Sequence, residues 1–443
     1  MITRTGFTSK FTQSTAEERK VTDMQTKKQV SLSSLPMEIL EHIFSFMHRD
    51  DLLQAMSVCT SWKSLIYNSP NLWTKQTFIL DCALHANKKK KVEMFFCAHN
   101  FGPHFRTLTV DCRHPYWHNC REMADKFNLF VSGLRAPALT SFIVSDLHLD
   151  SASRIVINKI SKTLTQMFTM VCHLKVFEMP AAHWPKALGR ELLDTVFQKS
   201  RNALETLDIS DYFIFQNGIP VSWDWFSTGL TSLTKLTKLS ITIYHLTDEI
   251  VLSLARTRRG QLTHLSMMAN YIFENSVKRY SWIYLRNACP KMAVEITIDG
   301  FVYEPHEAIP YFFEPLELPV GLLNMTLTKG CHPRTMSVTE MEIALDYVSS
   351  HYCQSLKNFT LGVYNKKDEN FDQSLIKLVR YCPFLVNVKV SAFFNSGDSA
   401  KTIDKIVADR LPPLLTSTAP ENKYVQLEDY SFQFQDRLEL FLH

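Results

Sequence analysis

The sequence has little glycine, no long apolar run and almost no net charge, and each shortage excludes a class of protein. Only 12 of the 443 residues are glycine, which disfavours glycine-rich phosphate-binding loops. No segment approaches the roughly 18 uninterrupted apolar residues of a membrane-spanning helix. The formal net charge is +4, too small to attract a polyanion over the whole surface. We therefore expect neither nucleic acid nor a membrane among the partners.

Short catalytic motifs are also missing, because the chain contains no GxSxG, HExxH, GxxxxGK[ST] or GxGxxG sequence. The densest group of metal-ligand residue types is DCRHPYWHNC at 111–120, with Cys112, His114, His118 and Cys120. Its Cys-x-His spacing is tighter than in the usual zinc sites, so we interpret the segment as a loop inserted after a strand. We predict no catalytic residue, no metal site, no cofactor and no enzymatic activity. An enzyme or metalloprotein centred on 111–120 remains the alternative.

The ten cysteines are dispersed from Cys59 to Cys382 rather than clustered in a small domain. This distribution is typical of reduced thiols in an intracellular protein, and we expect a cytoplasmic or nuclear location, or both. The first residues are rich in Ser and Thr and lack the apolar core of a secretory signal. We therefore predict a disordered N-terminal tail over residues 1–30.

An unusual concentration of apolar residues follows that tail, between residues 35 and 73. The first part predicts a helix with one broad apolar stripe formed by Leu35, Ile39, Leu40, Ile43, Phe44 and Met47. Asp50 and Thr60 are suited to begin a second and a third short helix. Three helices in about 40 residues are too few to bury such a stripe, so we expect another protein to cover it.

The residue types at fixed positions of this segment resemble the F-box motif. The matching positions are Leu35-Pro36, Glu38-Ile39-Leu40, Ile43-Phe44, Asp51-Leu52-Leu53, Val58-Cys59, Trp62, Leu65 and Leu72-Trp73. The resemblance implies an F-box over 31–80 that binds the Skp adaptor and, through it, the cullin of an SCF (Skp–cullin–F-box) ubiquitin ligase. It implies adaptor contacts by Leu35, Pro36, Ile39, Leu40, Ile43, Phe44, Leu52, Leu53, Val58, Cys59, Trp62, Leu65, Leu72 and Trp73. A helical subdomain that packs only on its own chain is the competing interpretation.

Beyond the F-box, an apolar triplet with spacing i, i+3, i+5 recurs ten times. The triplets begin at Phe105, Leu139, Leu174, Leu204, Leu236, Leu262, Ala293, Leu322, Leu356 and Leu385, at intervals of 26 to 35 residues. Met292 could replace Ala293 as the first member of its triplet. Segments with helical periodicity lie between triplets, for example 247–260, 339–353 and 371–385. A strand followed by a helix at this period predicts a solenoid with one continuous core.

The segments RYCPFLVNVKV at 380–390 and HYCQSLKNFTL at 351–361 resemble the cysteine-containing repeat of leucine-rich-repeat F-box proteins. The resemblance implies an α/β fold, in which a parallel sheet lines the concave face of a curved solenoid and helices cover the convex face. We expect a linker helix region over 81–104, about ten irregular repeats over 105–410, and a C-terminal cap or tail over 411–443. An ordinary α/β domain is the competing interpretation.

In such a solenoid the strand residues that alternate with the buried positions face outward and form a binding wall. We predict substrate contacts by Thr206, Asp208, Lys238, Ser240, His264, Glu295, Thr297, Asn324, Asn358 and Lys389. Hydroxyls and amides dominate this set, which favours a polar protein segment as the ligand. The sequence thus predicts a substrate-recognition subunit of an SCF-type ubiquitin ligase, and the alternative is an adaptor-bound scaffold that does not promote degradation.

Overall fold

The computed structural model describes residues 35–80, 88–113, 120–214, 224–271, 277–301, 312–328, 338–363, 371–392, 394, 397–410 and 425–427. The chain divides into two compact units, Met1–Leu72 and Trp73–His443. The predicted tail at 1–30 and most of the predicted C-terminal segment lie outside the described residues. No described helix is long and apolar enough to cross a membrane. The cysteines whose side chains the structure describes are free thiols, namely Cys59, Cys97, Cys112, Cys172, Cys289, Cys353 and Cys382.

The described part of the first unit consists of helices α1 (Met37–Phe44), α2 (Arg49–Ala55) and α3 (Thr60–Asn68), followed by a 3₁₀ turn that starts at Pro70. The aromatic edge of Phe44 meets Trp62 at a centroid distance of 5.1 Å, which joins α1 to α3. The three expected helices are present, although their first residues differ slightly. Helix α3 is capped by the Cys59 sulfur, which accepts a hydrogen bond from the backbone N–H of Trp62.

The second unit is built on one sheet in which every described strand pairs with its sequence neighbours in parallel. The strands are β1 (Lys75–Leu80), β2 (Thr107–Cys112), β3 (Ser141–Ser145), β4 (Val176–Glu178), β5 (Thr206–Ile209), β6 (Lys238–Thr242), β7 (His264–Tyr271), β8 (Ala293–Phe301), β9 (Val320–Thr328), β10 (Asn358–Val363), β11 (Asn387–Ser391) and β12 (Val425–Leu427). The predicted α/β class with a parallel sheet is therefore confirmed.

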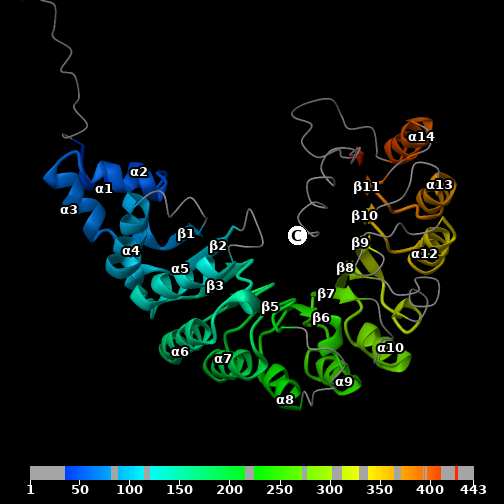
Figure 1. Ribbon diagram of the computed structural model, residues 1–443, viewed down its shortest axis with the longest axis horizontal. Coiled ribbons are helices and arrows are strands. Elements are labelled where there is room, and N and C mark those ends of the chain that lie inside the picture. Colours follow the sequence, from blue (N-terminus) through cyan, green and yellow to red (C-terminus); the bar gives the residue numbers. More distant parts are fainter. Residues whose placement is uncertain are drawn as a thin grey trace, which may run out of the picture. The chain divides into compact units, whose positions relative to one another are not determined.

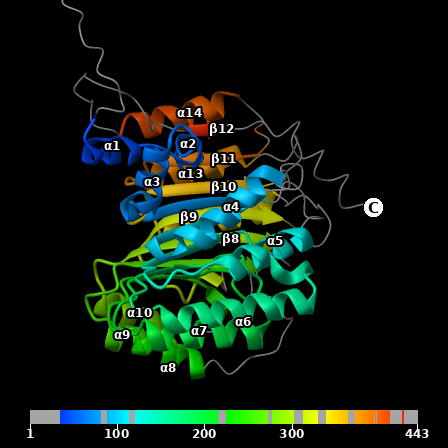
Figure 2. The same cartoon turned by 90° about the vertical axis from the view of Figure 1, so that its left-hand side faces the viewer.

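Helices connect the strands and cover one face of this sheet. They are α4 (Lys88–Phe101), α5 (Cys120–Gly133), α6 (Arg154–Met170), α7 (Lys186–Lys199), α8 (Asp224–Ser232), α9 (Asp248–Thr257), α10 (Arg279–Ala288), α12 (Val338–His351), α13 (Asp372–Tyr381) and α14 (Gly397–Ala408). Within the second unit the strands follow the inner side of an arc and the helices its outer side (Figure 1). In the view turned by 90°, strands β8 to β11 of this unit lie side by side, one above another (Figure 2). The helices expected from 247–260, 339–353 and 371–385 are present as α9, α12 and α13.

The core forms because equivalent apolar residues of successive strands are paired in register. Leu108 is paired with Phe142, Phe142 with Phe177, and Phe177 with Leu207, and all four side chains are buried. Burying a Leu or Phe side chain contributes about 1.5–3 kcal/mol relative to leaving it exposed. Each repeat supplies one such layer, so the layers join into a continuous core along the sheet.

Two of the ten predicted triplets are out of register with the structure. In β8 the buried side chains are Val294, Ile296 and Ile298, while Ala293 is exposed and Met292 is buried. In β9 the residues that align with the buried Phe359 and Leu361 of β10 are Leu323 and Met325, so the predicted triplet at 322, 325 and 327 is shifted. Both strands carry apolar residues on both faces, and their periodicity alone fits more than one register.

The sheet also begins earlier than expected, at Lys75 instead of near residue 105. Strand β1 lies inside the range assigned to the F-box, and its buried positions include the polar residue Gln76, which concealed it from an apolar pattern. At the other end β12 pairs with β11 in parallel and so extends the sheet within the predicted C-terminal segment. The rest of 411–443 lies outside the described residues.

Candidate functional sites: an apolar helical face and a polar sheet face

Helix α1 and the turn after it expose an apolar strip. The side chains of Ile39, Ile43 and Phe46 are 47%, 40% and 76% exposed, and they are spaced four and three residues apart. This spacing places Ile39 and Ile43 on one face of the helix, with Phe46 following on the turn. Leu40 and Phe44 form a separate buried stripe that packs inside the unit. The single broad stripe expected from the sequence is therefore two stripes, of which one is exposed.

The predicted adaptor-binding residues separate into three groups by exposure. Leu40, Phe44, Leu52, Leu65, Leu72 and Trp73 are buried. Leu35, Leu53 and Trp62 are partly exposed, and Pro36, Ile39, Ile43, Val58 and Cys59 are exposed. The buried members can support an interface only by holding the helices in place. Trp73 belongs to the second unit, where it packs on Phe101.

Two further exposed apolar residues, on α1 and just after it, were not predicted. Met37 is 44% exposed in the first turn of α1, and Phe46 contacts the ring edge of His42 with a centroid distance of 4.9 Å. The signal for Phe46 was its position three residues after Ile43. We define the apolar helical face as Ile39, Ile43 and Phe46.

The predicted substrate contacts all lie on the sheet face opposite the described helices. The structure arranges these residues in three rows across the strands. The first row holds Thr206, Lys238 and His264, the second holds Asp208, Ser240, Glu295 and Asn358, and the third holds Thr297, Asn324 and Lys389. Each of these residues is at least partly exposed. We call this surface the polar sheet face.

The polar sheet face carries two neighbouring carboxylates on β4 and β5. Glu178 pairs directly with Asp208 in the strand register. Burial raises the pKa of Glu178, and the adjacent Asp208 raises it further while Lys238 lowers it. Burial also raises the pKa of Asp208, against hydrogen bonds donated by Ser210 from its backbone N–H and hydroxyl at 3.0 and 2.6 Å. Glu178 was not among the predicted residues, although it stands one position after the buried Phe177.

Elsewhere on this face polar groups are paired with one another. The Nε2 atom of His264 lies 3.3 Å from Glu295 Oε2, and the amide of Asn387 donates to Asn358 Oδ1 at 2.6 Å. Such side chains can donate hydrogen bonds to the backbone carbonyls of a peptide and accept them from its N–H groups. The chemistry of this face therefore suits a polar peptide segment. Among the described residues of this face, carboxylates and amides separate the lysines, so these residues form no continuous basic track of the type that follows a phosphate backbone.

The structure describes only part of the segment at 111–120 that the sequence suggested as a possible metal site. The Cys112 side chain is fully buried on the core side of β2, and burial is the main reason that the pKa of its thiol is raised. Asp111 lies on the opposite face, where Arg113 Nε donates to it at 2.7 Å. The positions of His114 and His118 and the side chain of Cys120 lie outside the described residues.

The N-terminal part of the described chain matches a known domain family. A family model described as F-box-like matches residues 32–79, so the chain carries an F-box-like domain there. The match covers the three helices, the following turn and nearly all of β1. No curated protein matches the sequence.

Proposed function

We propose that this protein is the substrate-recognition subunit of an SCF-type ubiquitin ligase. The observation that carries the proposal is the F-box-like domain at residues 32–79, because F-box domains generally bind Skp-type adaptors. The exposed apolar helical face supports it. Ile39, Ile43 and Phe46 expose large apolar groups next to one another on a small helical unit, as a protein interface does.

In this proposal the second unit is a leucine-rich-repeat solenoid, and its polar sheet face holds a protein substrate. The parallel strands at regular intervals along the chain support the repeat assignment. In this proposal the subunit supplies no catalytic residue and binds neither nucleic acid nor membrane. It acts by raising the effective concentration of substrate lysines near the conjugating enzyme that the cullin recruits. We place it in the cytoplasm, the nucleus or both.

The adaptor interface is tested by adding a charge to the apolar helical face. We expect Ile39→Asp with Ile43→Asp to reduce co-purification of the Skp adaptor at least about tenfold, because a buried unpaired carboxylate costs several kcal/mol. The matched control is Ile155→Asp on α6, an isoleucine that is 68% exposed in the second unit. Equal adaptor recovery from both variants would contradict the proposal.

The substrate role is tested on the polar sheet face. Lys238→Glu with Lys389→Glu reverses two exposed charges without touching the core. We expect this variant to keep the adaptor and to lose proteins captured by proximity labelling with the wild-type chain. The same proteins should become more abundant when the wild-type chain is depleted. If their abundance does not change, the protein is instead a non-degradative scaffold bound to the adaptor.

A further inference from the structure

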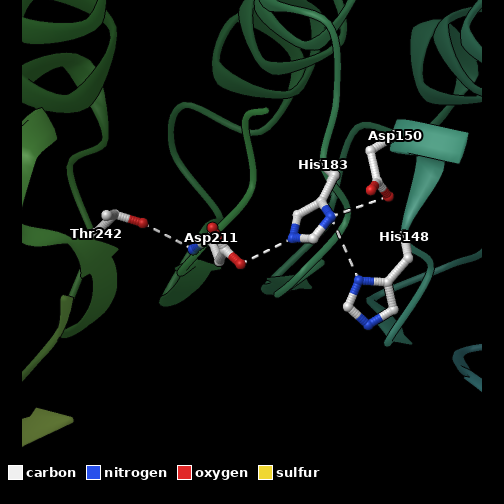
Figure 3. Close-up of polar contacts among 5 residues, drawn as sticks. All are labelled: His148, Asp150, His183, Asp211 and Thr242. Atoms are coloured by element: carbon white, nitrogen blue, oxygen red, sulfur yellow. Dashed lines mark hydrogen bonds and ion pairs between the residues drawn. The ribbon is translucent and has the colours of Figure 1, made fainter. Parts of the chain in front are cut away.

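Four polar residues gather beyond the carboxyl ends of strands β3, β4 and β5. The Nδ1 atom of His183 lies 3.4 Å from Nδ1 of His148 and 3.2 Å from Oδ1 of Asp150. The other ring nitrogen of His183, Nε2, lies 2.8 Å from Oδ2 of Asp211 (Figure 3). The backbone N–H of Asp211 donates to the hydroxyl of Thr242 at 2.7 Å, which fixes its position.

The backbone of this group is held in an unusual conformation. His148, His183 and Asp211 have φ values of 45°, 53° and 50°, in the left-handed region that side chains other than glycine rarely adopt. Backbone hydrogen bonds between neighbouring loops, such as His148 N–H to Ala181 O at 3.1 Å, hold the conformation. Strain of this kind concentrates at functional sites, where it orients particular side chains.

We propose that this group is a binding site for a divalent transition-metal ion of the zinc type. The ligands would be Nδ1 of His148, Nδ1 of His183 and the carboxylate of Asp150, whose ligand atoms all lie within 4.8 Å of one another. Zinc–nitrogen and zinc–oxygen bonds near 2.1 Å at tetrahedral angles separate neighbouring ligand atoms by roughly 3.3–3.5 Å. Of the two distances from His183 Nδ1, 3.4 Å lies within that range and 3.2 Å lies 0.1 Å below it.

Asp211 is placed to orient His183 as a metal ligand. A ligating histidine usually donates its other ring N–H to a carboxylate, which fixes the tautomer and orients the ring. With Nδ1 of His183 on the metal, its Nε2–H would donate to Asp211, and that nitrogen lies 2.8 Å from Asp211 Oδ2. Thr242 in turn holds Asp211 through its backbone N–H.

The charges around His183 favour a cation between the loops. The carboxylate oxygens of Asp150 and Asp211 lie 3.2 and 2.8 Å from the two nitrogens of the His183 ring. Two carboxylates this close to the same ring attract positive charge, and a metal ion held by Asp150 and His183 would supply it.

The donor set selects the kind of ion. Two imidazoles and one carboxylate suit zinc and its first-row neighbours, whereas magnesium and calcium prefer oxygen ligands alone. Three protein ligands leave a coordination position for water or for a ligand from another molecule. Asp150 has 48% of its side chain exposed, so an ion can reach the group from solvent. The site is independent of the proposed adaptor interface, since none of its residues belongs to the F-box-like domain.

The test is metal binding by the full-length protein after treatment with a chelator. Zinc is titrated against a competing chelator, and cobalt(II) is used separately because its visible spectrum reports the ligand set. We expect one ion whose affinity falls at least about 100-fold in His148→Ala and in Asp150→Asn. Asp211→Asn should weaken binding about 10- to 100-fold, as loss of an outer carboxylate does. The control is His173→Ala, which removes an exposed imidazole that follows α6.

Three results would overturn the metal site. The first is no binding at micromolar free zinc, which would leave a histidine protonated between two carboxylates. The second is equal affinity in the wild type, His148→Ala and Asp150→Asn, with circular dichroism showing that all are folded. The third is a cobalt spectrum with thiolate charge-transfer bands, which would place the ion on cysteine. Because Asp150 is partly exposed, Asp150→Asn remains informative even if His148→Ala does not fold.

Discussion

The indole ring of Trp73 lies flat against the phenyl ring of Phe101, with centroids 3.7 Å apart and ring planes 5° from parallel. Both side chains are buried, at 0% and 1% exposure. Trp73 ends the apolar segment that resembles the F-box, yet it forms the first layer of the core in the sheet unit. Phe96 adds an edge contact to Phe101 at 5.8 Å, so an aromatic group covers this end of the core.

Replacing Trp73 should therefore destabilise the sheet unit. We expect Trp73→Ala to lower the free energy of unfolding by about 3–5 kcal/mol, because a large buried aromatic leaves a cavity that the core cannot fill. Urea denaturation followed by circular dichroism measures the change. Tyr67→Ala, which removes a 42% exposed ring from α3, should change stability by less than about 1 kcal/mol. A small effect at Trp73 would mean that the stacked pair is not part of the folded core.

Arg258 provides a second stability prediction, because its guanidinium is buried where α8 ends. Its two terminal nitrogens donate to the carbonyls of Thr231 and Thr234, both at 2.9 Å, and burial lowers its pKa. Arg258→Gln should lower the free energy of unfolding by about 1–3 kcal/mol, since the carbonyls lose their donors. The adjacent Arg259 is exposed, so Arg259→Gln is the control and should be near neutral in thermal unfolding. Equal melting temperatures for the two variants would contradict this role.

The raised pKa of Asp208 should make the stability of the protein depend on pH. Its pKa in the folded protein is raised by burial above the ordinary value of 3.8. From about pH 3.8 upward the folded state therefore binds more protons than the unfolded state, and this residue's contribution to stability falls as pH rises. The substitution Asp208→Asn removes the titrating group, so this residue no longer makes stability fall as pH rises. The amide oxygen of asparagine can still accept the hydrogen bonds from Ser210. We expect the variant to be more stable than the wild type near pH 7.

The measurement is urea denaturation of both proteins at intervals from pH 3.5 to pH 7. The stability difference between Asp208→Asn and the wild type should shrink towards zero at the acidic end, where the wild-type carboxyl is protonated in both states. Ser240→Ala, at the paired position of β6, changes no titrating group and should give a difference that is independent of pH. A pH-independent difference for Asp208→Asn would contradict the raised pKa.

Several features of the fold could be predicted because they depend on local periodicity. Phe142, Phe177 and Leu207 are apolar at the same point of each repeat, so the sequence predicts both the strands and their order. Gln76 breaks the pattern in β1, and Leu322 faces outward from β9 although it is apolar. The spacing of apolar residues alone does not show that Gln76 is buried or that Leu322 faces outward, since neighbouring strands determine which face of a strand is buried.

The candidate sites could be predicted from the sequence only in part. Ile43 is exposed and Phe44 is buried because of the way α1 packs against α3. The sequence shows two adjacent apolar residues and does not indicate which of them is exposed. The histidine–aspartate group offered one sequence signal. His148 and His183 each stand four residues after a buried residue at the end of a strand: Val144 in β3, and Met179 directly after β4. Equivalent positions of adjacent repeats lie side by side, which brings together residues 35 apart in the chain.

The register of the strands also sets a length scale for recognition. Adjacent strands are roughly 4.8 Å apart, whereas an extended peptide places side chains on one face at intervals of about 6.8 Å. A peptide crossing the polar sheet face would come back into step with it only about every third strand. Specificity should then depend on a few strands spaced apart, such as β6 with Lys238 and β9 with Asn324. Substitutions on the strands between them should be tolerated, so a few positions would determine what the whole surface selects.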